Sequence, residues 1–146
     1  MSEATRFVDN GDGTVTDTRT GLMWTRTDSM IDLKKWVNYQ ECLDYVRGLN
    51  ERRFAGFTDW RLPTREEMLT LYDPQFELKD RFGKKVHIAP VFQEGCGFSM
   101  VAQMVPGRIR TWVLNLRTGE LDHPDGLWTL AEAARAVRTA APPPGD

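Results

Sequence analysis

A short stretch late in the chain combines arginines, an indole and an amide in the alternating pattern of a β-strand. Its polar and aromatic members are Arg108, Arg110, Trp112, Asn115 and Arg117. Guanidinium groups form paired hydrogen bonds with sulfate and carboxylate groups, and an indole offers a flat face for stacking. The stretch could therefore hold a sulfated or carboxylated sugar. The alternative is that Trp112 belongs to the core and that the arginines are ordinary charges at a strand edge.

A second group of chemically capable side chains is acidic and lies near the start of the chain. It comprises Asp9, Asp12 and Asp17. A calcium-binding loop places oxygen ligands at alternate positions, so that the backbone wraps the ion. Here Gly11 occupies the third position counted from Asp9, and no acid stands at the twelfth. We expect a plain hairpin turn, with a calcium site at the three aspartates as the alternative.

Residues for catalysis are few. His87 and His123 are the only histidines, and the chain has no Gly-x-Ser-x-Gly, Walker or dinucleotide-binding motif. The neighbouring carboxylates Glu66 and Glu67 are explained by the first turn of a helix, where acidic side chains favour the helix dipole. We therefore predict that the protein is not an enzyme and that it binds no cofactor.

The bulk properties predict one soluble domain. The 146 residues are enough for one core, and 40% hydrophobic with 27% charged residues is an ordinary balance. The net charge of -2 gives no general attraction to nucleic acid, and no apolar run is long enough for membrane insertion. The N-terminus lacks a signal-like stretch, which predicts a cytoplasmic protein, or an extracellular one if this is a mature exported form. Cys42 and Cys96 are free in the first case and could be bridged in the second.

The first part of the chain predicts antiparallel strands followed by a helix. The residues at 10–13 are Asn, Asp and Gly, which favour a tight turn, so we expect strands within Phe7–Trp24. Apolar residues three or four apart then predict a helix over Leu33–Asn50. Asp32 is its expected N-cap.

The segment Asp59–Glu67 is expected to join a strand to a second helix. Trp60 and Leu62 are predicted core residues, and Pro63 ends the strand because it lacks an N–H donor. Arg61 is expected to hold a neighbouring carboxylate or carbonyl group.

The second helix is expected to begin after Thr64, because Thr64 and Glu67 have the spacing of a capping box. It should end at Asp73–Pro74, since the residue before a proline avoids the α region.

The remaining elements are mainly strands. We expect a core strand over Phe98–Met104, a strand over Arg108–Leu116 and a hairpin turn at Arg117–Glu120. The chain end is ambiguous. Thr129–Arg135 has good helix propensity and a capping-box spacing, whereas the resemblance described next favours a strand over Ala133–Arg138.

Several blocks of the chain resemble the Legionella-collagen-like protein C-terminal domain family. The blocks are Phe7–Asp17 with Thr20–Trp24, Trp36 with Phe54–Thr64, Trp112–Glu120, and Ala134–Arg138. The signature positions, with Trp36 expected on a helix, are Trp24, Trp36, Asp59, Trp60, Arg61, Leu62, Pro63, Thr64 and Glu67. The resemblance spans nearly the whole chain.

The segment Arg61–Thr64, followed by Glu66, also resembles the formylglycine-generating sulfatase-modifying family. Both resemblances imply an α+β, C-type-lectin-like fold, in which two helices pack on twisted antiparallel sheets. Formylglycine-enzyme activity is not implied, because Cys96 has no partner cysteine near the C-terminal end. The chain also departs from the first family at Phe98–Met100, where a Tyr/Trp-Ser-Ser run is usual.

The resemblance implies a binding role. We expect a non-catalytic ligand-binding module, 7–139, between a flexible N-terminus, 1–6, and a disordered Pro-rich tail, 140–146. Its ligand would be a sulfated or acidic polysaccharide, on a face built by the 108–117 strand and the segment 83–97. The alternative is an intracellular protein-interaction or scaffold domain, in which case the chain could form homo-oligomers.

Overall fold

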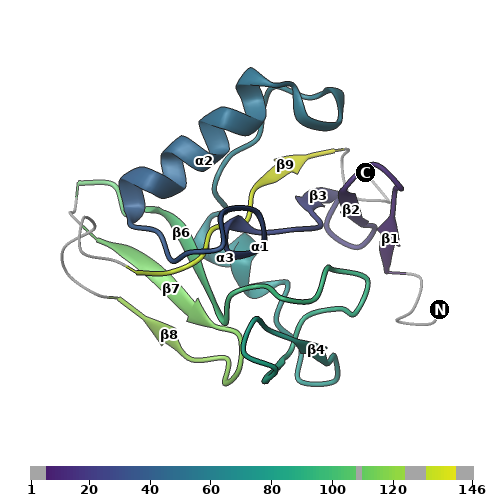
Figure 1. Cartoon of the computed structure of the whole chain (residues 1–146), viewed down its shortest axis with the longest axis vertical. Helices are drawn as coiled ribbons and strands as arrows, with labels where there is room; N and C mark the ends of the chain where they lie inside the picture. The colour runs from purple at the N-terminus through teal and green to yellow at the C-terminus, as the bar shows by residue number, and fades with distance from the viewer. Residues whose placement is uncertain (1–5, 108–109, 124–130, 141–146) are drawn as a thin grey trace.

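The computed structural model of the chain describes residues 6–107, 110–123 and 131–140. Within these ranges the protein is a mixed α/β structure with few helices and three antiparallel sheets (Figure 1). The first sheet joins both ends of the described chain in the order β1-β2-β3-β9. Its strands are β1 (Phe7–Asp9), β2 (Thr14–Asp17), β3 (Leu22–Thr25) and β9 (Val137–Thr139). The predicted N-terminal antiparallel strands are confirmed.

The β1–β2 turn needs glycine for two separate reasons. Gly11 and Gly13 have φ values of 80° and 90°, a region that residues with a Cβ atom rarely adopt. A Cβ atom at Gly13 would also lie 2.8 Å from a ring atom of Phe54. The turn therefore packs closely against the loop that follows the longest helix.

The longest predicted helix is in fact two helices with a break between them. The α-helices are α1 (Ser29–Leu33), α2 (Tyr39–Glu51) and α3 (Arg65–Leu69). The prediction of one helix over Leu33–Asn50 is wrong in its first part. Lys34 adopts the left-handed conformation, with φ of 61°, and ends α1. The side chain of Asn38 then starts α2 by forming a capping box with Glu41, which leaves Trp36 between the helices.

The prediction that Asp32 is the N-cap of the helix over Leu33–Asn50 is wrong, because Asn38 caps α2 and Asp28 caps α1. One carboxylate oxygen of Asp28 accepts a hydrogen bond from the Ile31 N–H at 3.0 Å, and the other accepts one from the Gly97 N–H at 2.9 Å. Burial raises the pKa of Asp28 above its usual range. Asp32 instead accepts a hydrogen bond from the Tyr45 hydroxyl at 2.5 Å.

The start of α3 confirms the predicted capping box. The Thr64 hydroxyl accepts from the Glu67 N–H at 3.1 Å, and the Glu67 carboxylate accepts from the Thr64 N–H at 2.9 Å. The helix ends at Leu69, earlier than the predicted end at Asp73–Pro74. There the Thr70 hydroxyl donates to the Glu67 carbonyl at 2.6 Å, which satisfies a carbonyl that the next helical turn would otherwise use.

Two further sheets complete the architecture. One has the order β6-β7-β8, and the other pairs β4 with β5. Their bounds are β4 (Leu78–Lys79), β5 (Lys85–Val86), β6 (Ser99–Met104), β7 (Thr111–Asn115) and β8 (Leu121–Asp122). The strands predicted over Phe98–Met104 and Arg108–Leu116 are confirmed as β6 and β7, with Arg108 and Ile109 outside the described residues. The hairpin β4–β5 was not predicted.

Strands β6 and β7 supply residues to two apolar clusters. Successive strand residues point to opposite faces. Val101 and Val113 therefore pack with the buried face of α2, whereas Met100 and Leu114 pack with the cluster that contains the fully buried Trp24. The central sheet thus binds the helical layer to the N-terminal sheet.

The ambiguous C-terminal segment is not helical where the structure describes it. Residues 131–136 form no helix, and Val137–Thr139 pairs with β3, so the strand alternative is correct at its end. Thr129 and Leu130 lie outside the described residues. Long-range hydrogen bonds override the local helix propensity. Glu132 and Val37 exchange backbone hydrogen bonds of 2.9 and 3.0 Å.

Arg6 belongs to the folded part rather than to the flexible N-terminus expected for 1–6. Its guanidinium group is buried and holds Asp17 through two hydrogen bonds of 2.9 and 2.7 Å. At the other end Ala140 is exposed, and its N–H still donates to a backbone carbonyl. Residues 1–5 and 141–146, assigned to the flexible N-terminus and to the Pro-rich tail, lie outside the described residues.

A pair of glycine substitutions tests this packing. A Cβ atom at Gly97 would lie 2.6 Å from the Ala133 Cβ and 3.2 Å from the Trp36 ring. We predict that Gly97→Ala lowers the free energy of unfolding by about 1–3 kcal/mol. At Gly48, in α2, the nearest atom lies 3.9 Å away on Arg52, so Gly48→Ala should raise it by about 0.5–1 kcal/mol. Urea unfolding measures both, and equal stability of the two variants would contradict the packing described.

Candidate functional site

The segment Asp59–Glu67 lies where α2, α3 and the C-terminal strand meet. Trp60 and Leu62 are 3% and 4% exposed, so both predicted core positions are confirmed. The Trp60 N–H donates to the side-chain oxygen of Asn50 at 2.7 Å, and the Asn50 amide nitrogen donates to the Trp60 carbonyl at 2.9 Å. One side chain of α2 thereby satisfies both backbone groups of the buried indole residue.

Arg61 connects this segment to two other elements. Its guanidinium group donates two hydrogen bonds to the Glu67 carboxylate, at 2.6 and 2.9 Å. Its backbone exchanges hydrogen bonds of 3.0 and 2.8 Å with Val137 of β9. The prediction that Arg61 holds a neighbouring carboxylate is confirmed, and that carboxylate also caps α3.

The charge balance of this pair favours its ionised form. Burial tends to raise the pKa of Glu67, but hydrogen bonds from Arg61 and from the Thr64 backbone outweigh burial and hold that pKa below its usual range. The hydrogen bond to Glu67 raises the pKa of Arg61. The charged groups of Arg61 and Glu67 are thus paired with each other within the fold.

Two of the five predicted ligand-binding residues on β7 and its turn are engaged inside the protein. The Arg117 Nε donates a hydrogen bond of 2.9 Å to the buried Asp80 carboxylate, and the guanidinium group forms an ion pair of 2.8 Å with it. The same guanidinium group lies 4.1 Å from the centre of the Phe98 ring. The side-chain oxygen of Asn115 accepts from the Arg117 N–H at 2.8 Å. These contacts fix the end of β7 against the segment that carries Asp80.

Of the other three candidates, the structure describes Trp112 and Arg110 but not Arg108. The Trp112 ring stacks on His123 with ring centres 4.2 Å apart, and the Arg65 guanidinium group lies 5.1 Å from the Trp112 ring centre. Arg110, two positions before Trp112, is partly buried, and Arg108 lies outside the described residues. A sugar site on this strand stays a prediction.

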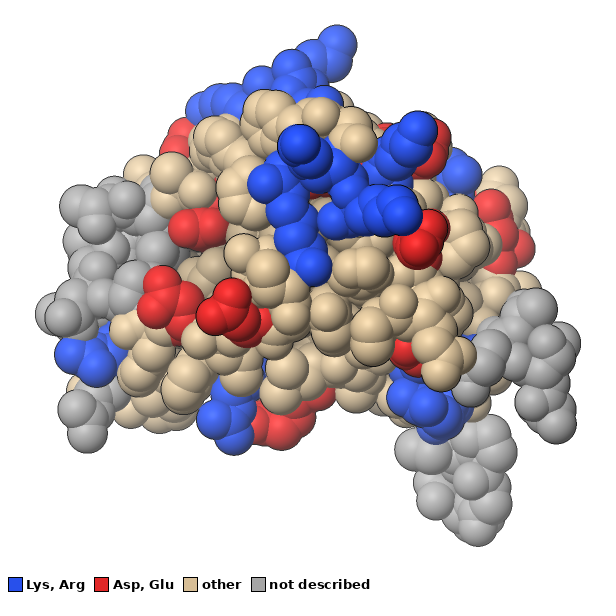
Figure 2. Space-filling view, turned by 90° about the horizontal axis from the view of Figure 1, so that it is seen from below, with Lys and Arg blue, Asp and Glu red and all other residues tan. Residues whose placement is uncertain are grey.

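The hairpin β4–β5 forms a basic surface, of which the predicted ligand face included only the part within the segment 83–97. Lys79, Arg81, Lys84 and Lys85 are all exposed there. The hairpin lies at the bottom of Figure 1, and Figure 2 shows Lys and Arg side chains gathered in one part of the face seen from below.

Asp80 organises this hairpin from within. Its side chain is fully buried. One carboxylate oxygen accepts hydrogen bonds from the N–H groups of Phe82 and Lys84, at 2.8 and 3.0 Å. The other oxygen holds Arg117. A buried carboxylate thus sets the turn that bears the exposed cations.

An aromatic cluster supports the tip of the hairpin. Phe82 is 54% exposed, the highest exposed fraction among the exposed large hydrophobic side chains of the described residues. Its ring stacks on Trp36, with ring centres 6.1 Å apart, and Phe98 packs edge-on against Trp36 at 4.9 Å. Trp36 therefore supports the hairpin tip through its stacked ring.

Comparison with known families decides where the chain belongs. The model of the Lcl C-terminal domain matches residues 13–138. The chain belongs to the Lcl C-terminal domain family. No curated protein matches it. The matched span runs from the first hairpin turn to β9, so it includes the signature segment, the central sheet and the basic hairpin of this Lcl C-terminal domain.

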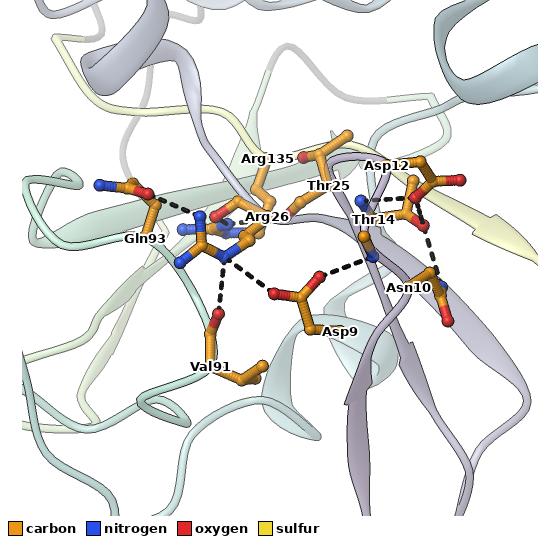
Figure 3. Close-up of polar contacts among 10 residues, drawn as sticks. Asp9, Asn10, Asp12, Thr14, Thr25, Arg26, Val91, Gln93 and Arg135 are labelled. Atoms are coloured by element: carbon orange, nitrogen blue, oxygen red, sulfur yellow. Dashed lines mark hydrogen bonds and ion pairs between the residues drawn. The ribbon is translucent and has the colours of Figure 1, made fainter.

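Two of the three aspartates of the calcium alternative, Asp9 and Asp12, hold the first hairpin turn of the Lcl C-terminal domain (Figure 3). Asp9 accepts from the Gly11 N–H at 2.9 Å and faces Arg26 at 3.5 Å. Asp12 accepts hydrogen bonds from the N–H and the hydroxyl of Thr14. Asp17 forms an ion pair with Arg6. No group of three or more His, Cys, Asp and Glu side chains in the described ranges could hold a metal ion.

The cysteines of the Lcl C-terminal domain are both free and buried. Cys42 and Cys96 belong to different apolar clusters. Burial raises the pKa of each thiol to about 12, so neither is a ready nucleophile. None of the helices in the described ranges has the length and apolar character that a membrane crossing requires.

The Arg61–Glu67 pair predicts a pH-dependent contribution to stability. Because the pKa of folded Glu67 lies below its unfolded value, the contribution is full above the unfolded value of about 4.3 and is lost as the pH falls through the folded value. We predict that Glu67→Gln costs about 1 kcal/mol at neutral pH and that this difference shrinks toward about pH 3.

Glu66→Gln is the matched control. Glu66 is exposed and pairs only with its neighbour Arg65 among the ion pairs described, so its loss should cost less than about 0.5 kcal/mol. Urea unfolding of both variants across the pH range measures the contributions. A Glu67→Gln effect that equals the Glu66→Gln effect, or that persists unchanged in acid, would argue against a stabilising Arg61–Glu67 pair.

Proposed function

We propose that this Lcl C-terminal domain is a non-catalytic binding module that holds an acidic or sulfated glycan on the hairpin β4–β5. The supporting observation is the exposed Phe82 ring within a turn flanked by four exposed cations, Lys79, Arg81, Lys84 and Lys85. Sulfate and carboxylate groups bind ammonium and guanidinium groups through charge-assisted hydrogen bonds. An aromatic face offers apolar contact area to the ring of a sugar.

The number of cations matters for affinity because each exposed charge contributes little binding free energy by itself. A single exposed ion pair is worth about 0.2–1 kcal/mol and is screened by salt. A linear glycan with regularly spaced acidic groups can engage several cations at once. Affinity from such contacts should fall as the salt concentration rises.

The rigidity of the hairpin supports the same proposal. Asp80 accepts two backbone hydrogen bonds within the turn, and it is itself held by Arg117. The Phe82 ring lies against Trp36. A surface fixed in this way loses less conformational entropy when a ligand binds.

A binding role also agrees with the placement of the histidines. His87 Nδ1 lies 2.9 Å from the Phe76 carbonyl oxygen, and the His87 ring packs against Tyr72. The His123 ring is stacked on Trp112. Both imidazoles therefore pack against aromatic side chains, which favours binding over acid–base catalysis.

We further propose that the fold is of the C-type-lectin-like type. The support is the packing of α2 and α3 against antiparallel sheets, together with membership of the Lcl C-terminal domain family. In this arrangement the hairpin β4–β5 carries the proposed binding surface.

Removing charge from the hairpin should weaken glycan binding. We predict that Arg81→Gln/Lys84→Gln lowers the affinity for a heparin oligosaccharide about tenfold at moderate salt, as expected for the loss of two exposed charge contacts. Calorimetric titration measures the dissociation constant. Arg19→Gln/Arg52→Gln removes the same charge from two exposed positions outside the hairpin and should leave affinity nearly unchanged.

Phe82→Ala separates a glycan site from a general anion site. It should weaken heparin binding while leaving the binding of inorganic polyphosphate unchanged, because polyphosphate has no sugar ring to stack. Equal losses for the two double variants, or no heparin binding at all, would contradict the proposed function.

A further inference from the structure

A second surface lies between α2 and the end of β6. A cavity of about 520 Å³ opens there. Its apolar lining includes Leu43, Trp60, Leu62 and Met104. Leu43 is 39% exposed and Met104 is 45% exposed, so apolar area remains accessible along the groove. Exposed apolar area of this kind is typical of interaction surfaces.

An adjoining cavity extends the groove toward Trp112. It has a volume of about 310 Å³ and shares Gln103 and Met104 with the first cavity. Pro106 also lines this second cavity. The two cavities meet at Gln103 and Met104, and we call the surface that they form together, from α2 across the end of β6 to β7, the trough. An elongated surface suits an extended chain.

A β-bulge exposes the two residues that both cavities share. The pairing of β6 with β7 shifts between Val101 and Met104, so two residues of β6 oppose Trp112 alone. The buried Thr111 hydroxyl lies 2.5 and 2.8 Å from two consecutive β6 carbonyl oxygens, those of Ala102 and Gln103. Bulges redirect side chains at strand ends, and here Gln103 and Met104 are both exposed.

The larger cavity has cationic side chains in its lining. These are Arg47 and Arg61, of which Arg61 is already held by Glu67, and no carboxylate lines this cavity among the described residues. Arg65 and Glu66, which pair with each other, line the smaller cavity. Arg47 is 64% exposed and pairs with Asp44 one helical turn away. Such an exposed pair contributes little and is readily exchanged. A bound carboxylate would therefore find a cation at the rim and apolar surface below it.

We infer that this trough docks an extended segment of a partner protein, in which a large apolar side chain lies next to acidic residues. The apolar side chain would enter the cavity beside Leu43 and Met104, and an acidic neighbour would face Arg47. Methionine suits this role because its flexible side chain adapts to varied partners.

The trough is separate from the basic hairpin. Figure 1 shows α2 at the top of the molecule and β4 at the bottom. No lining residue of the two trough cavities belongs to β4 or β5. The docking site can therefore be tested independently of glycan binding.

A random peptide display library selected on the full chain tests the inference. We expect the enriched peptides to combine net negative charge with at least one large apolar residue. When these peptides are synthesised and their binding is measured by fluorescence anisotropy, Leu43→Glu should weaken binding about tenfold or more. Arg47→Gln should weaken it to a smaller extent, because it removes one exposed charge.

Leu69→Glu provides a matched control, since Leu69 is exposed to the same 39% as Leu43 and lines neither trough cavity. Its peptide affinity and the thermal unfolding of all three variants should match those of the parent chain. The inference is overturned if selection enriches nothing or only basic peptides. It is equally overturned if Leu69→Glu weakens binding as much as Leu43→Glu does.

Discussion

Arg61 imposes the constraint on which the rest of this domain depends. Its backbone pairs with β9, and its side chain holds the carboxylate that caps α3. The residues on either side, Trp60 and Leu62, enter the core below α2. One short extended segment therefore joins the C-terminal strand, two helices and the central sheet. Since β9 also pairs with β3, this segment adjoins the sheet that contains both the first and the last described strands.

The parts of the fold that could be predicted are those with local causes. The capping box of α3 lies within four consecutive residues, and the first hairpin turn is encoded by Asn, Asp and Gly side by side. The break between α1 and α2 has a local signal in the capping-box spacing of Asn38 and Glu41. Apolar periodicity continues through the break, however, and Lys34 carries no sign of its left-handed conformation. Residues 131–136 have helix propensity, but backbone hydrogen bonds to distant segments decide their conformation.

The same distinction explains what could be predicted of the candidate site. Residue types showed that Arg117 and Asn115 are capable of binding an anion. They could not show that Arg117 is already paired with Asp80, which lies 37 positions earlier in the chain. The strands β4 and β5 have two residues each, too few for an alternating pattern to be visible. The position of the Phe82 ring depends on its stacking against Trp36, a residue that only the fold brings next to it.

The domain thus has a scaffold, centred on Arg61, and a proposed binding face on the hairpin that Asp80 organises. The most direct test is a map of backbone amide chemical shifts by NMR during titration with a heparin oligosaccharide. We expect the largest changes to cluster at residues 79–85 and at Arg117, with little change at residues 59–67. Changes centred on residues 59–67, or along β7 around Trp112, would contradict the proposed binding face.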